Sequence, residues 1–130
     1  MKRKIMAVTL TAAMLAGLAA VPVWADDTGS DEGKVLNIYC WNEEFKSRLT
    51  DHYPGYEEVD GTHGKIGDVD VVWNITPSDD NAYQNNLDET LLKQADASAD
   101  DKIDLFLVEA DYALKYVNTD YTMPVADLGI

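Results

Sequence analysis

Cysteine is nearly absent from this chain. Cys40 is the only one in 130 residues, so no internal disulfide can form. It lies inside the apolar run VLNIYCW, which favours a buried, inert thiol over a reactive one. Only two histidines are present, His52 and His63, and neither stands in a recognisable nucleophile motif. The sequence therefore offers neither a zinc site nor a Cys-His catalytic pair.

Basic residues are also scarce. Ten Lys and Arg stand against 24 Asp and Glu, for a formal net charge of −14. Nucleic acid is therefore disfavoured as a partner, because phosphate binding needs a positive surface. No glycine-rich phosphate loop joins a strand to a helix, and no Gly-x-Ser-x-Gly elbow is present. We accordingly expect no cofactor and no hydrolase of the nucleophile-elbow type.

The first 25 residues have the layout of a secretory signal peptide. Three basic residues at positions 2–4 precede an apolar run over 5–20, and small or apolar residues stand before a cleavage point between Ala25 and Asp26. An uncleaved membrane anchor is the alternative, since the run approaches the roughly 20 residues that span a bilayer. Cleavage would leave an acidic chain of 105 residues that is exported to the cell surface, the periplasm or the medium.

From residue 34 onward, strand-like and helix-like segments alternate. Residues 26–33, DDTGSDEG, are expected to form a flexible acidic tether before them. The expected strands are 35–41, 69–75 and 104–110. The expected helices run from Asn42 to Pro54, from Pro77 to the ASADD stretch, and over 112–118. This alternation predicts an α/β fold with a parallel sheet and flanking helices, in which the 35–41 strand lies between the other two.

Three details of these segments carry further expectations. In the second helix, an apolar stripe over Tyr83, Leu87 and Leu91 is extended by Leu92 and Ala95. The apolar run 105–108 is typical of a strand that is covered on both faces. The stretch GTHGKIGD, 61–68, is interpreted as a turn-rich connection.

Polar and aromatic side chains gather where the strands end. Ligands of open α/β sheets bind outside the carboxyl ends of the strands. An aromatic ring can cover the C–H face of a sugar while carboxylates and amides bind its hydroxyls. A helix cap at Asp111 and ordinary loop chemistry are the alternative interpretation. The three tips are Trp41-Asn42-Glu43, Asn74-Ile75-Thr76 and Glu109-Ala110-Asp111-Tyr112.

Several longer stretches resemble the N-terminal part of extracellular solute-binding proteins of ABC importers, in the carbohydrate-type family 1. The strongest pieces are DLFLVEADYALKYVN and PVADLGI, and LNIYCWNEEFKSRL, YPGYEEV and NNLDETLLKQ add to them. The resemblance covers nearly all of 34–130. It implies part of the N-terminal lobe of a type II, periplasmic-binding-protein-like fold, whose two lobes close over a solute.

The resemblance also implies partners and site residues. A monomer without enzymatic activity would bind a sugar or oligosaccharide and deliver it to permease subunits in the membrane. The cleft edge would carry Trp41, Asn42, Glu43, Glu109, Asp111 and Tyr112. Two lobes do not fit in 105 residues, so a fragment of such a protein is expected.

Two other function classes stay open. One is a small secreted α/β enzyme that acts on glycans through carboxylates such as Asp111. The other is a secreted module whose acidic face binds a cationic partner. Glycan hydrolysis would favour the enzyme, and strongly salt-sensitive binding to a basic protein would favour the module.

Overall fold

Five strands form one mixed sheet in the order β2-β3-β4-β1-β5. The structure, a computed structural model, describes residues 33–129, so the expected signal peptide and residues 26–32 of the tether lie outside the described residues. The strands are β1 (Val35–Cys40), β2 (Tyr56–Glu58), β3 (His63–Ile66), β4 (Val69–Ile75) and β5 (Leu105–Phe106). β1 runs parallel to both β4 and β5, which confirms the α/β class and the central place of the first strand.

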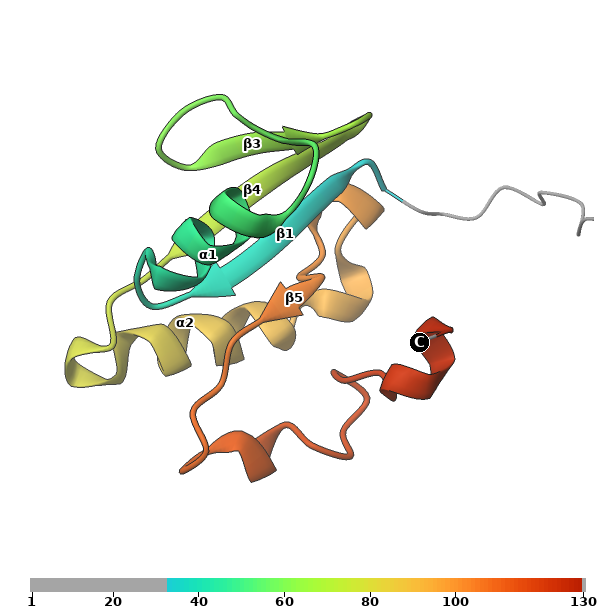
Figure 1. Ribbon diagram of the computed structural model, residues 1–130. Helices are drawn as coiled ribbons and strands as arrows, with labels where there is room; N and C mark the ends of the chain where they lie inside the picture. Colours follow the sequence, from blue (N-terminus) through green and yellow to red (C-terminus); the bar gives the residue numbers. More distant parts are fainter. Residues whose placement is uncertain (1–32, 130) are drawn as a thin grey trace, which may run out of the picture.

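The two α-helices cover opposite faces of the sheet. α1 (Glu44–His52) lies on one face and α2 (Ala82–Leu91) on the other (Figure 1). Successive strand residues point to opposite faces. Ile38 and Cys40 of β1 therefore belong to the core on the α1 side, while Tyr39 packs on the α2 side. The chain runs from β1 through α1 toward β4, and then from β4 through α2 back past β1 to β5. Crossovers of the same hand that run in opposite directions along a sheet place their helices on opposite faces.

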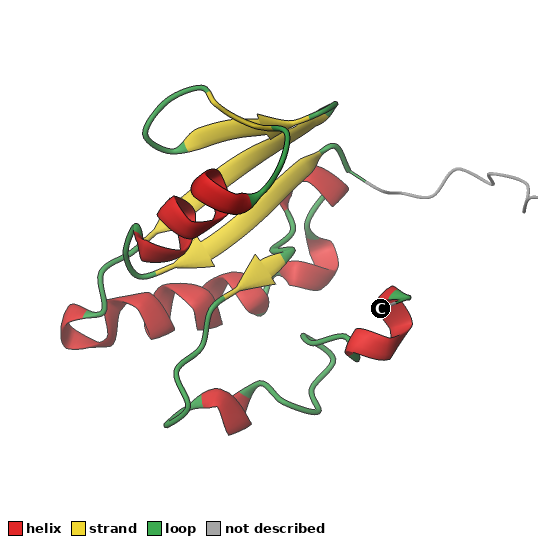
Figure 2. Cartoon of the chain, in the orientation of Figure 1, coloured by secondary structure: helices red, strands yellow, loops and turns green. Residues whose placement is uncertain are grey.

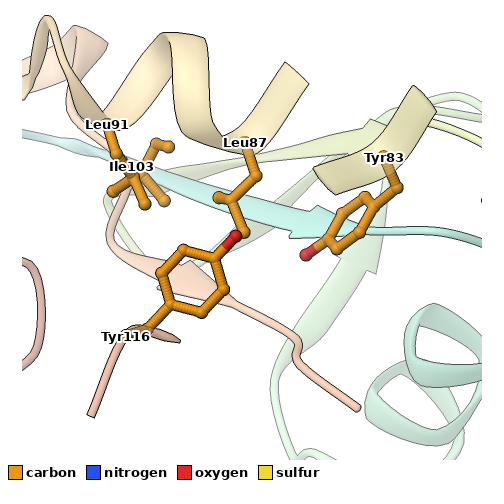
Figure 3. Packing of buried hydrophobic residues seen from close by; sticks show 5 residues of the cluster. All are labelled: Tyr83, Leu87, Leu91, Ile103 and Tyr116. Carbon is orange, nitrogen blue, oxygen red and sulfur yellow. The ribbon is translucent and has the colours of Figure 1, made fainter. Parts of the chain in front are cut away.

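The α1-side core consists of the fully buried Ile38, Cys40 and Val71 together with Trp73, which is 2% exposed. The α2-side core consists of Tyr83, Leu87, Leu91, Ile103 and Tyr116 (Figure 3). The expected stripe of α2 is confirmed for its three main members, which project from one side of the helix. It is wrong for Leu92, which is 75% exposed, because the α-helix ends at Leu91 and a 3-10 turn follows over Gln94–Asp96.

The interpretation of 61–68 as a connection is wrong, because β3 forms there and pairs antiparallel with both β2 and β4. Ile66 pairs with Val69 across a two-residue loop, in which Gly67 has a φ of +59° that favours glycine. Gly64 lies against the ring of Tyr56, where a Cβ atom would overlap the phenol. The sheet is therefore mixed, not parallel throughout.

The expected strand 104–110 and helix 112–118 are both shorter than predicted. β5 has two residues, and the chain beyond it forms only 3-10 turns over Ala113–Lys115 and Val125–Leu128 (Figure 2). β5 is an edge strand whose outer edge has no partner within 33–129. Phe106 packs on the α2-side core and Leu107 on the α1-side core, but Leu105 is 40% and Val108 36% exposed, so the expected cover on both faces is only partial. In 112–118 only Tyr116 is buried, and Leu114 is 85% exposed. A seven-residue segment with one buried side chain gains too little packing to stabilise an α-helix.

Candidate functional site

The carboxyl ends of β1 and β5 form the topological switch point of the sheet. The chain passes from β1 to β4 on one side of β1, and then returns through α2 to β5 on the other side. The arrowheads of β1 and β5 point the same way in Figure 1. Crevices at such points are the usual ligand sites of open α/β sheets. All six predicted site residues follow one of these two strands, so the topology brings both groups to one edge of the sheet.

A hollow of about 190 Å³ lies on the α1 side of this edge; we call it the α1-side hollow. Its lining consists of Trp41, Asn42, Glu44, Phe45, Arg48 and Leu107. Asn42 Oδ1 accepts a hydrogen bond from the Glu44 N–H at 3.0 Å. The N-cap of α1 is nevertheless Glu43, and no side chain caps the helix there, so the expected N-cap role of Asn42 is wrong by one position. Arg48 donates to Glu44 Oε1 at 2.7 Å across one helical turn. Glu43 is exposed beside this hollow and does not line it.

A second hollow of about 150 Å³ lies at the beginning of α2; we call it the α2-side hollow. Its lining consists of Ser78, Asn81, Tyr83, Gln84, Glu109, Asp111 and Tyr112. All of them except Tyr83, whose phenol belongs to the buried core, offer a polar group to the hollow. The hollow is therefore suited to bind the hydroxyl and amide groups of a ligand. Burial, followed by the neighbouring carboxylates, raises the pKa of Tyr112 and keeps its phenol protonated.

The structure places the predicted residues in two groups. Trp41 and Asn42 line the α1-side hollow, whereas Glu109, Asp111 and Tyr112 line the α2-side hollow. Both aromatic rings are half-buried against the α2-side core: Trp41 meets Tyr83 edge-on at 5.5 Å, and Tyr112 meets Tyr116 at 6.4 Å. Part of each ring is therefore used in packing, and only the remainder is accessible to a ligand.

The alternative role of Asp111 as a helix cap is wrong. The 3-10 turn that follows begins after Tyr112, and no side chain caps it. The turn is instead closed by backbone bonds, with the Tyr112 N–H donating to the Glu109 carbonyl at 3.2 Å. Asp111 is exposed at the rim of the α2-side hollow, and no ion pair within 33–129 involves it.

Sequence reasoning missed four lining residues from the beginning of α2: Ser78, Asn81, Tyr83 and Gln84. Tyr83 was assigned to the core stripe, which is correct but incomplete. A usable signal was its place in the first turn of a helix that follows the carboxyl end of a strand. The third predicted tip, at Asn74, lines neither hollow, because β4 lies away from the switch point.

Cys40 takes no part in this site. Its thiol is fully buried in the α1-side core, which confirms the predicted burial, and this burial raises the pKa of the thiol. Within 33–129, no three His, Cys, Asp or Glu side chains are grouped so as to hold a metal ion. In the same range, every helix falls short of the length and apolarity required to cross a bilayer.

Comparison with known proteins finds no family model, no curated protein and no solved structure that matches this chain. Its function is therefore argued from its own residues and topology.

Proposed function

We propose that this chain is a solute-binding component of an ABC importer and that its ligand is a sugar or oligosaccharide. Its partners are then the permease subunits in a membrane, and it works as an exported monomer without catalysis. The carrying observation is the convergence of two half-buried rings and a set of amides and carboxylates on the β1/β5 switch point. The resemblance of its motifs to family 1 solute-binding proteins, with their type II two-lobe fold, supports the same proposal.

The chemistry of the edge suits a neutral polyhydroxylated ligand. The exposed part of each ring offers an apolar surface to sugar C–H groups, as at Trp41 and Tyr112. Asn42, Glu109 and Asp111 are exposed beside these rings and offer hydrogen-bonding groups to hydroxyls. Net charge favours the same assignment, because a chain at −14 repels anionic ligands.

The test is a titration with sugars followed at Trp41. Labelling the exported chain, which begins at Asp26 after the expected cleavage, with 5-fluorotryptophan gives separate 19F resonances for Trp41 and Trp73, which Trp→Phe variants assign. Glucose, galactose, xylose, maltose and cellobiose are added to high millimolar concentration. We expect at least one sugar to shift the Trp41 resonance saturably while the Trp73 resonance stays unchanged, because Trp73 is buried in the α1-side core.

Matched variants separate binding from fold. Asp111→Asn with Glu109→Gln is expected to weaken the same titration, since both side chains line the α2-side hollow. Asp51→Asn is the control, because Asp51 is exposed on α1 and lines neither hollow. Absence of a saturable shift with any of the five sugars would reject the proposal. Release of reducing sugar from cellobiose, lost in Asp111→Asn, would favour the secreted enzyme instead.

A further inference from the structure

β1 and β5 diverge at the switch point, and one backbone bond marks the place. The Leu107 N–H donates to the Tyr39 carbonyl at 3.0 Å. Beyond it the Cys40 carbonyl turns to β4 and accepts from the Thr76 N–H at 3.0 Å. Within 33–129, no backbone hydrogen bond joins 41–43 to 108–112. The spacing of these two segments, which carry all six predicted site residues, must therefore depend on side chains.

The hydroxyl of Tyr83 lies at this point of divergence. It donates to the Leu107 carbonyl at 2.7 Å and to the Tyr39 carbonyl at 3.1 Å, so one O–H group is shared between the two strands. Tyr83 is 1% exposed, so its hydroxyl is shielded from bulk solvent, and a hydrogen bond is stronger in such an environment. Burial raises the pKa of its phenol, so the proton that makes the bond stays in place at ordinary pH.

The same side chain contacts both groups of predicted site residues. Its ring meets the Trp41 ring edge-on at 5.5 Å and an interplanar angle of 76°. It also lines the α2-side hollow together with Glu109, Asp111 and Tyr112. Figure 3 shows it projecting from the same side of α2 as Leu87 and Leu91. The side chains of Leu87 and Leu91 have no polar atom, so Tyr83 is the residue of this stripe that hydrogen-bonds to both strands.

We propose that Tyr83 is the positioning residue of the crevice: its hydroxyl sets how far Trp41 stands from the segment 109–112. It acts on the ligand through these residues and through the two carbonyls. The inference rests on the proposed function, because the distance that it sets is the width of the proposed sugar site. Removing this one hydroxyl leaves the side chains of Trp41 and of the segment 109–112 chemically unchanged, so its effect on their spacing can be tested by itself.

The test compares two Tyr→Phe variants of the exported chain. Tyr83→Phe removes the shared hydroxyl. Tyr56→Phe is the matched control, because its hydroxyl accepts a hydrogen bond from Trp73 Nε1 at 3.0 Å within the other core. With 5-fluorotryptophan labelling, we expect Tyr83→Phe to move the Trp41 resonance and leave Trp73 in place. Tyr56→Phe should do the reverse.

The binding readout uses the same five sugars. We expect Tyr83→Phe to weaken the tightest of them by about two- to tenfold, the range that corresponds to the net loss of one hydrogen bond. Tyr56→Phe should leave the affinity unchanged. Dissociation constants are corrected for the folded fraction, read from the intensities of the native 19F lines, so partial unfolding of a variant does not imitate the result.

The outcomes separate the two proposals. If Tyr83→Phe binds the sugar as the unaltered chain does, or shifts Trp41 no more than Tyr56→Phe does, the positioning role is wrong while the proposed function stands. If the unaltered chain binds no sugar, the proposed function fails and the positioning role fails with it. If both variants weaken binding equally, the hydroxyl acts through general stability, and the inference is overturned.

Discussion

Side-chain hydrogen bonds to the backbone connect the segment that precedes β5 to β1 and to the chain after α2, and β5 itself has only two residues. Asn37 of β1 donates its side-chain amide to the carbonyls of Asp100 at 2.8 Å and Lys102 at 2.9 Å. Gln94 pairs with both backbone groups of Ile103, donating at 2.8 Å and accepting at 2.9 Å. The bond to the Asp100 carbonyl is exposed, whereas those to Lys102 and Ile103 are part-buried. Loss of the part-buried bonds would leave a carbonyl or N–H group unpaired, at about 1–3 kcal/mol each.

The environment of Asp60 predicts that the stability of the fold depends on pH in the acid range. The Thr62 N–H, which donates at 2.8 Å, and then the His63 side chain lower the pKa of Asp60 from 3.8 to about 2. A carboxyl with a lowered folded pKa stabilises the fold above its unfolded pKa and loses that contribution as pH falls through its folded pKa. We expect the Thr62 amide resonance to shift with a midpoint near pH 2, and Asp60→Asn to abolish the transition. Persistence of the same midpoint in Asp60→Asn would assign the transition to another group.

At the scale of elements, the β2–β3 hairpin packs against the α1-side core through a close contact between Gly64 and the Tyr56 ring. Tyr56 lies across Gly64, and its ring reaches Trp73 edge-on at 6.5 Å. Lys46, only 8% exposed, crosses from α1 to donate to the Gly61 carbonyl at 2.7 Å. The hairpin is therefore attached to the α1-side core by an aromatic contact and by one buried lysine.

Gly64→Ala tests this attachment. The added methyl group would overlap the Tyr56 ring and force it away from Trp73, so we expect a loss of about 1–3 kcal/mol in the free energy of unfolding. Gly61→Ala is the control, because nothing lies within 4 Å of an added Cβ there. Urea denaturation measures both. Equal midpoints for the two variants would show that the Tyr56 ring moves aside without cost.

For the whole molecule, net charge and exposed apolar surface have opposite effects on self-association. The net charge of −14 disfavours self-association. Against it, the chain after β5 exposes Leu114 at 85%, Met123 at 63% and Val125 at 62%. The outer edge of β5 adds unpaired backbone groups to this surface, a feature that promotes strand pairing between chains.

The size of the two hollows predicts weak binding by this chain alone. Volumes of about 190 and 150 Å³ are below the roughly 300 Å³ at which ligand pockets usually begin. Each polar contact contributes about 0.5–1.5 kcal/mol net, while association costs at least about 4 kcal/mol. We therefore expect calorimetry to give sugar dissociation constants no lower than about 1 mM, which corresponds to about 4 kcal/mol. A micromolar constant would mean that the site is complete without a second wall.

Local patterns in the sequence determined several features without help from the fold. The β-rich runs at 35–41 and 69–75 became β1 and β4, and the four-residue spacing of Tyr83, Leu87 and Leu91 became the buried face of α2. These predictions succeed because side-chain period and helix propensity are properties of neighbouring residues. The burial of Cys40 followed for the same reason, since it occupies an inward position of an apolar strand.

Only the tertiary structure decided how these pieces meet. The hairpin signal of Gly67-Asp68 was present in the sequence, but the pairing of β3 with β4 depends on the neighbouring strand. β5 stops at Phe106 because β1, the strand that it pairs with, ends at Cys40 and turns toward β4. The division of the predicted site into two hollows, with Tyr83 between them, arises from contacts such as that between Tyr83 and Tyr39, which are 44 positions apart. Contacts over such separations leave no periodic trace in the sequence, so only the folded chain reveals them.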